Sequence, residues 1–395
     1  MAFACGLPGV GAWGAGASRQ IQRTRWDGRG AHSPDLCRGF RLSSPVVCMS
    51  MSDARRMGRS AGRWEGSLAR YTPDGQFVSR QPTILFLEAE YPFSSGSTSN
   101  DDVDPVGISI ALRRPAGGQR DALEYRTKSM LQNMRLSGTF CSDLGAYSNG
   151  TLQLSSMAPP VLEQGMNACT VDQNGASVPV EARVRGVIFY EFCGSGGFKL
   201  SGLSVFREKR SDPAKEEDMK AERMRVPQSS VVSPDVANAD VNDVASTQTV
   251  AFRSLSEYFA ALEGTWRGRS ETFTSEAPAG APPVVSEYTM QFDFDAASQT
   301  IRVRSDTPAS FETVGTVSAS NALTATFDRS TLSMVLLGES GVTSLQPAAF
   351  SIPSTAPLLF ELCWFRTANE RYRVSRTYRA NGAWMSTFFS RETRV

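Results

Sequence analysis

Trp64-Glu65-Gly66 and Trp266-Arg267-Gly268 each stand at the start of a long stretch of short, alternating apolar segments. The two stretches then show the same features in the same order. Each has a Glu-x-Cys strand near its end and an Arg-Glu-x-Arg finish: Glu191-Phe192-Cys193 and Arg207-Glu208-Lys209-Arg210 in the first, Glu361-Leu362-Cys363 and Arg391-Glu392-Thr393-Arg394 in the second. A repeated order of this kind predicts one structural unit that is used twice.

Strands at hairpin spacing fill both stretches. The turn Thr72-Pro73-Asp74-Gly75 has Pro and Gly where turn geometry favours them, and Asn381-Gly382 is the strongest hairpin signal in the chain. Ser254-Leu255-Ser256-Glu257 is a capping-box pattern, which predicts a short helix just before Trp266. Many short alternating strands with almost no helix predict an all-β fold of two tandem antiparallel up-and-down barrels.

The chain divides into four regions. A length of 395 residues is too great for one compact core, so two domains are expected. We expect the first barrel over residues 58–210 and the second over residues 251–395. Residues 211–250 lack an apolar period and are expected to form a flexible linker. Residues 1–50 contain six Arg, no Lys and only two acids, which is the composition of an organelle transit peptide.

The leader composition predicts a chloroplast protein that works in the stroma. A disordered tail or a wrongly chosen start codon is the open alternative for residues 1–50. The only histidine, His32, lies in this segment. A mature chain without histidine has no Ser-His or Cys-His pair and no imidazole metal ligand, which argues against hydrolases and zinc enzymes. We therefore expect no catalytic residue, no metal site and no tightly bound cofactor.

Charge and hydropathy exclude further classes of partner. The formal net charge of +1 gives no electrostatic reason to expect nucleic-acid binding. No apolar run is long enough to predict a transmembrane segment. Cys141, Cys169, Cys193 and Cys363 are scattered without metal-ligand spacing, so we expect them to be small core residues.

The C-terminal half carries a family resemblance. Its passage from Glu257 to Ser270, centred on Gly264-Thr265-Trp266, resembles the Gly-x-Trp start of lipocalins and of the S-type phycobiliprotein lyases. Three further motifs resemble those lyases: Glu361-Leu362-Cys363-Trp364-Phe365, Asn369-Glu370-Arg371-Tyr372-Arg373-Val374-Ser375 and Ser390-Arg391-Glu392-Thr393-Arg394. Ala368 stands where that family has proline, and Arg391 is inserted into the closing motif. The whole chain is also similar, over most of residues 60–210 and 252–395, to an uncharacterised plastid and cyanobacterial family of two-barrel lipocalin-like proteins.

This resemblance implies a ligand site inside the second barrel. The candidate ligand-binding residues are Arg269, Glu361, Trp364, Arg371, Arg373, Ser375 and Glu392. Strand alternation puts Arg371 and Arg373 on one face, where two inward guanidiniums could clamp the propionates of a bilin or a fatty-acid carboxylate. An outward, solvated pair is the alternative. Glu361 and Trp364 are three residues apart and lie on opposite strand faces, so only one is expected to line the lumen.

Structural roles are expected for a second set of residues. Trp64 and Trp266 are predicted to plug the barrel floors. Arg210 and Arg394 are candidates to stack across these tryptophans, as closing arginines do in lipocalin-like folds. The first barrel has Gly194-Ser195-Gly196-Gly197 after its Glu-x-Cys strand and no arginine pair there. We therefore expect the first barrel to be structural and the second to hold the pocket.

Three functions are compatible with these features. The first is a plastid protein that binds or chaperones a tetrapyrrole, or a similar hydrophobic acid, and assists chromophore attachment to a phycobiliprotein or another photosynthetic client. Any enzymatic activity would then resemble that of a phycobiliprotein chromophore lyase. The second is a non-enzymatic assembly or scaffold factor of the photosynthetic apparatus. The third is a lipid or fatty-acid carrier. A cavity lined by Arg371, Arg373 or Glu361 favours binding, whereas a lumen filled by apolar side chains favours the scaffold.

Overall fold

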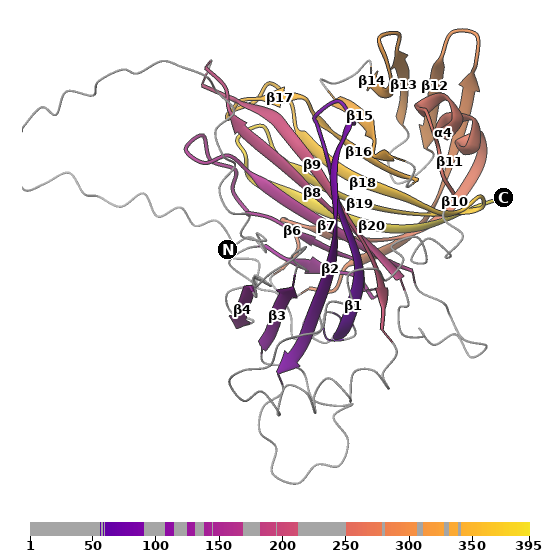
Figure 1. Cartoon of the computed structure of the whole chain (residues 1–395). Helices are drawn as coiled ribbons and strands as arrows, with labels where there is room; N and C mark the ends of the chain where they lie inside the picture. The colour runs from indigo at the N-terminus through magenta and orange to yellow at the C-terminus, as the bar shows by residue number, and fades with distance from the viewer. Residues whose placement is uncertain are drawn as a thin grey trace, which may run out of the picture.

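The chain folds into two β units joined by an extensive interface (Figure 1). The computed structural model describes residues 56, 58, 60–90, 107–113, 125–130, 138–143, 145–168, 182–194, 196–211, 250–278, 281–305, 311–327, 332–338 and 341–395. The predicted transit peptide and almost all of the predicted linker lie outside these residues. None of the helices in the described part of the chain is long and apolar enough to cross a membrane.

The second unit is a closed antiparallel barrel, as predicted. Its strands pair in chain order and β10 pairs with β20 to complete the ring. The strands are β10 (Gly264–Thr274), β11 (Val284–Asp295), β12 (Thr300–Ser305), β13 (Phe311–Ser318), β14 (Asn321–Phe327), β15 (Leu332–Leu336), β16 (Val342–Pro347), β18 (Leu358–Thr367), β19 (Glu370–Tyr378) and β20 (Trp384–Arg394). The predicted Asn381-Gly382 hairpin joins β19 to β20, with Gly382 at a φ of 84°.

The first unit forms a second antiparallel sheet with the order β4-β3-β2-β1-β9-β8-β7-β6-β5. Its strands are β1 (Gly62–Tyr71), β2 (Phe77–Glu90), β3 (Gly107–Arg113), β4 (Tyr125–Met130), β5 (Phe140–Cys141), β6 (Tyr147–Asn149), β7 (Val161–Ala168), β8 (Ala182–Phe192) and β9 (Phe198–Arg210). A short strand of the second unit, β17 (Ala349–Phe350), pairs with β9 and extends this sheet.

Both units begin in the same way. A glycine with positive φ, Gly62 at 139° and Gly264 at 108°, precedes each tryptophan by two residues. Such a backbone conformation favours glycine because it has no Cβ. Each indole Nε1 donates to the carbonyl four residues earlier, Trp64 to Ser60 at 3.0 Å and Trp266 to Leu262 at 2.7 Å. Both tryptophans are fully buried.

The helix α4 (Leu255–Leu262) precedes the second tryptophan, as its capping box predicts. The Ser254 hydroxyl accepts from the Glu257 amide at 3.2 Å, and the Glu257 carboxylate accepts from the Arg253 amide at 2.7 Å. Leu255, Tyr258, Phe259 and Leu262 are buried. This apolar face packs on the barrel core, so α4 positions its side chains at one end of the lumen.

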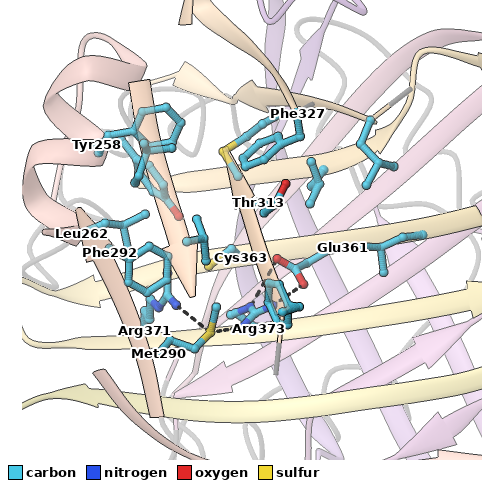
Figure 2. Close-up of a pocket in the computed structure, with 18 residues that line it drawn as sticks. Tyr258, Leu262, Met290, Phe292, Thr313, Phe327, Glu361, Cys363, Arg371 and Arg373 are labelled. Atoms are coloured by element: carbon cyan, nitrogen blue, oxygen red, sulfur yellow. Dashed lines mark hydrogen bonds and ion pairs between the residues drawn. The ribbon is translucent and has the colours of Figure 1, made fainter. Parts of the chain in front are cut away.

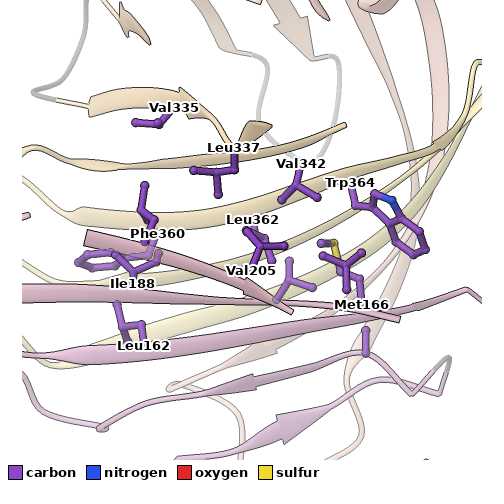
Figure 3. Packing of buried hydrophobic residues seen from close by; sticks show 14 of the residues in the cluster. Leu162, Met166, Ile188, Val205, Val335, Leu337, Val342, Phe360, Leu362 and Trp364 are labelled. Carbon is purple, nitrogen blue, oxygen red and sulfur yellow. The ribbon is translucent and has the colours of Figure 1, made fainter. Parts of the chain in front are cut away.

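The two units pack sheet against sheet. One apolar cluster contains residues from both, including Leu162, Met166, Ile188 and Val205 of the first unit and Phe360, Leu362 and Trp364 of the second (Figure 3). Polar contacts reinforce it: Tyr190 donates to the Pro347 carbonyl at 2.7 Å, and Gln164 donates to the Phe360 carbonyl at 3.0 Å. The outer face of β18 and β19 is therefore an internal interface of the molecule.

Candidate functional site

The polar centre of the second barrel is a network of two arginines and two glutamates. Glu392 on β20 accepts from Arg371 and, at 3.0 Å, from Arg373 Nη1. Arg373 also binds Glu361 on β18 through both Nη2, at 2.7 Å, and Nε, at 3.3 Å. Tyr288 on β11 donates its hydroxyl to Glu392. Strand alternation thus turns both arginines inward, where every charge meets an opposite one.

Burial and ion pairing oppose each other in this network. Burial raises the pKa of the Glu392 carboxyl, but the Arg371 and Arg373 guanidiniums outweigh that effect and hold its pKa below the ordinary value. Burial, together with the Glu392 charge, raises the pKa of Tyr288 well above its usual range. Glu392 is therefore ionised and Tyr288 is protonated near neutral pH.

A cavity of about 160 Å³ lies above the network (Figure 2). The polar network contributes Glu361, Arg371 and Arg373 to its lining, and Cys363 lies beside them. Most of the remaining wall is apolar: Phe259, Leu262, Met290, Phe292, Ile301, Val303, Phe311, Phe327, Leu332, Met334, Leu345 and Leu359. This arrangement provides an apolar chamber with a charged but internally paired floor.

Helix α4 supplies a hydroxyl to the cavity. The Tyr258 hydroxyl accepts a hydrogen bond from Thr343 Oγ1 at 3.1 Å. Burial raises the pKa of this tyrosine well above its usual range, and burial raises the pKa of the neighbouring Cys363 thiol to about 11. A protonated thiol is a poor nucleophile, so the cavity presents no activated cysteine near neutral pH.

The structure separates the predicted ligand-binding residues into three groups. Glu361, Arg371 and Arg373 line the cavity, and Glu392 holds the arginines from below. Ser375 pairs in register with Glu361 beside the network. In contrast to expectation, Arg269 and Trp364 do not line the cavity: Arg269 is exposed on the outer barrel face, and Trp364 packs in the interface with the first unit.

Strand geometry explains both differences. Trp266, Gly268 and Ser270 point inward on β10, so the period of two turns Arg269 outward. The same period puts Glu361 inside and Trp364 outside on β18. Among the predicted floor arginines, Arg394 lies 5.2 Å from the Trp266 ring centroid. Arg210 donates to the Ala61 carbonyl at 2.7 Å, while a different arginine, Arg183, covers Trp64.

The first unit contains a copy of the arginine–glutamate network. Glu208 on β9 accepts from Arg183 Nε at 2.6 Å and from Arg185 Nε and Nη2, each at 2.8 Å. Arg185 Nη1 reaches Glu163 on β7 at 2.9 Å, and Tyr147 donates to the same carboxylate at 2.5 Å. The expectation that the first unit lacks an inward arginine pair is therefore wrong.

The two networks occupy equivalent places. Arg183 faces Glu208 across the last two strands of the first unit, as Arg371 faces Glu392 across the last two strands of the second. Arg183 lies 4.0 Å from the Trp64 ring centroid, and Arg371 lies 5.2 Å from that of Trp266. The Arg-x-Arg spacing was visible in the sequence. The sequence comparison aligned Glu191-Phe192-Cys193 with Glu361-Leu362-Cys363, but these two motifs lie on strands that are not equivalent. The first ends β8, which occupies the place of β19 in its unit, whereas the second lies on β18.

The chain is similar to several known proteins. Residues 257–395, which span the second barrel and most of α4, match the family model described as "Biogenesis factor required for ATP synthase 1, C-terminal domain". No curated protein matches the chain. A protein of unknown function from the DUF3598 family of Nostoc punctiforme is 19% identical, with a TM-score of 0.59, and the match covers 87% of this chain and 99% of that one. An S-type phycobiliprotein lyase from Guillardia theta is 17% identical, with a TM-score of 0.29, covering 36% of this chain and 93% of the lyase.

The Nostoc protein shares the two-unit fold along nearly its whole length. At this level of identity the likeness extends to the fold alone.

Proposed function

We propose that this protein is a non-enzymatic assembly factor for ATP synthase and works in the plastid. The family match over residues 257–395 supports the choice of client. The observation that carries the mode of action is the repeated arginine–glutamate network. Because its four charges pair with each other in both units, the inward arginines act as internal braces of each β unit. Client recognition then falls to the outer surfaces.

The interface between the units supports the same proposal. Its shared apolar core and buried hydrogen bonds hold the two β units in one fixed relation. A rigid two-unit body presents its outer loops and strands in a constant geometry, and preorganised surfaces lose less entropy on binding a partner. Such a body suits a factor that holds a subunit in place during assembly.

Disruption of the gene tests this function. We expect assembled ATP synthase, measured by native gel electrophoresis and quantitative mass spectrometry, to fall several-fold while other membrane complexes of the organelle keep their levels. Re-expression of the full chain restores the enzyme, and cross-linking during recovery captures ATP synthase subunits on this protein. Unchanged ATP synthase in the disrupted strain would contradict the proposal.

A second candidate function is a carrier for a tetrapyrrole or a similar hydrophobic acid. The cavity that meets Glu361, Arg371 and Arg373 favours this candidate. The volume of this cavity, about 160 Å³, argues against a tetrapyrrole, because sites for drug-sized ligands measure roughly 300–1,000 Å³. If the carrier function holds, a biliverdin-type bilin titrated into the purified protein shifts its visible spectrum to the red, and Arg373→Ala abolishes the shift. An unshifted spectrum rejects this candidate and leaves the assembly function untouched.

A further inference from the structure

Most of the cavity wall in the second barrel is apolar, and away from its charged floor the polar groups in its lining are the hydroxyls of Tyr258 and Thr313 and the Cys363 thiol. Leu262 of α4 lines one end of the cavity, and Phe327 projects from a strand around it (Figure 2). Phe259, Ile301 and Leu345 also belong to the lining. Phe311, which is 45% exposed, marks a side of the wall that is in contact with solvent. A molecule entering here would exchange water for hydrocarbon over most of its surface, which favours an apolar ligand.

The floor of the cavity carries no net charge. Two guanidiniums, Arg371 and Arg373, are balanced by two carboxylates, Glu361 and Glu392. Two of the guanidinium nitrogens that pair with Glu392 also lie against the sulfur of Met290, at 3.8 Å from Arg371 Nη2 and 2.9 Å from Arg373 Nη1. An incoming carboxylate that bound Arg373 would displace Glu361 from it. That exchange would leave a buried glutamate without its counter-ion, which is strongly unfavourable.

The size of the chamber sets a second limit. An engineered cavity of about 150 Å³ lined by Leu, Ile and Phe stays dry and binds benzene. The barrel cavity, at about 160 Å³, has a similar volume, and most of its wall is lined by the same kinds of apolar side chain. We propose that it binds an uncharged apolar molecule, or the uncharged apolar end of a longer one, of about the size of a single aromatic ring, and discriminates against acids of the same size.

This inference does not depend on the assembly function. It concerns the purified chain and needs no ATP synthase, so either proposal can fail while the other stands. It also separates the cavity from a carrier of hydrophobic acids, because the two require opposite preferences for charge.

Toluene and benzoate form a matched pair of probes at neutral pH. Both contain one six-membered ring, and only benzoate is charged. Binding to the full-length protein is measured by saturation-transfer NMR and by the rise in melting temperature with probe concentration. We expect toluene to bind at least about tenfold more tightly than benzoate, which corresponds to a difference of about 1.4 kcal/mol in binding free energy. Equal affinities, tighter binding of benzoate, or no binding of toluene would overturn the proposal.

Two variants place the probe in the cavity. Leu345→Phe adds a ring to the cavity wall and should abolish toluene binding. Val284→Phe adds the same ring at the first residue of β11, where the side chain is 63% exposed, and should leave toluene binding unchanged. If Leu345→Phe binds toluene like the native chain, the probe is elsewhere and the assigned site is wrong.

A third variant tests whether the paired charges of the floor set the selectivity. Glu361→Gln removes one carboxylate from the floor and gives Arg373 an unbalanced charge facing the cavity. We expect benzoate to gain at least about tenfold in affinity while toluene changes little. Near-UV circular dichroism shows whether this variant keeps its native packing. Unaltered benzoate affinity in a folded Glu361→Gln protein would refute the role given to the floor. If this variant does not fold, the ratio of toluene to benzoate affinity in the native protein tests the proposal by itself.

Discussion

Arg376→Leu is expected to lower the free energy of unfolding by about 4 kcal/mol, because it leaves several buried acceptors without a donor. Arg376 is fully buried, and its guanidinium crosses the interface between the units. It donates to the carbonyls of Gly138 at 2.8 Å, Gly150 at 2.9 Å and Thr151 at 3.1 Å, and to the Tyr378 hydroxyl at 2.7 Å. Urea unfolding followed by fluorescence measures the loss.

Arg379→Leu is the matched control for this prediction. Arg379 lies three residues further along the chain, is about half exposed, and pairs with the exposed Glu276 at 3.1 Å. Exposed ion pairs contribute roughly 0–1 kcal/mol, so this variant should remain close to the native protein. Arg376→Lys keeps the charge but not the planar fork that reaches several carbonyls, and should fall between the two. If both leucine variants unfold at the same urea concentration, Arg376 does not hold the units together.

The fold could be predicted from local signals in the chain. Alternation of apolar and polar residues, the Asn381-Gly382 turn and the capping box at Ser254 each specify a local geometry, and all agree on an antiparallel barrel with one short helix. The repeated Trp-x-Gly motif correctly indicated two related units. These signals are read within a few residues, which is why they need no knowledge of distant partners.

The site depended on information that local signals do not carry. Spacing placed Arg371 and Arg373 on one strand face but left open whether that face was inside. Trp364 also lacked a local signal, because its environment comes from β strands of the other unit. Arg376 was missed for the same reason, since its acceptors lie more than two hundred residues earlier in the sequence. Contacts between distant segments decide which polar residues are buried.

The arginine–glutamate networks show that the feature repeated in the two units is a buried set of ion pairs. A clamp for ligand carboxylates would need arginine donors that are free in the unliganded protein. In this chain each inward arginine already donates to a glutamate, and one arginine of each pair lies over the tryptophan of its own unit. The repeat therefore preserves a buried brace in each unit, and the cavity of the second barrel lies over the brace of that unit.

Removal of either central glutamate is expected to destabilise the protein strongly. Glu208→Gln leaves Arg183 and Arg185 buried without their shared counter-ion, and Glu392→Gln does the same to Arg371 and Arg373. Breaking a buried ion pair on one side costs about 3–5 kcal/mol. Glu312→Gln is the control, because Glu312 also lies between two arginines, Arg302 and Arg304 at 3.3 Å each, but is half exposed. It should lose no more than about 1 kcal/mol.

The pH dependence of the Glu208 variant gives an independent check. Burial raises the pKa of Glu208, but the Arg183 and Arg185 guanidiniums outweigh it and lower the pKa from 4.5 to about 2. A carboxylate with a lowered pKa contributes its full stabilisation above its unfolded pKa and loses it as the pH falls toward its folded pKa. We therefore expect the difference in unfolding free energy between native protein and Glu208→Gln to be constant above about pH 5 and to shrink between about pH 4.5 and pH 2. A difference that stays the same down to pH 2 would show that the carboxylate charge is not what stabilises this network.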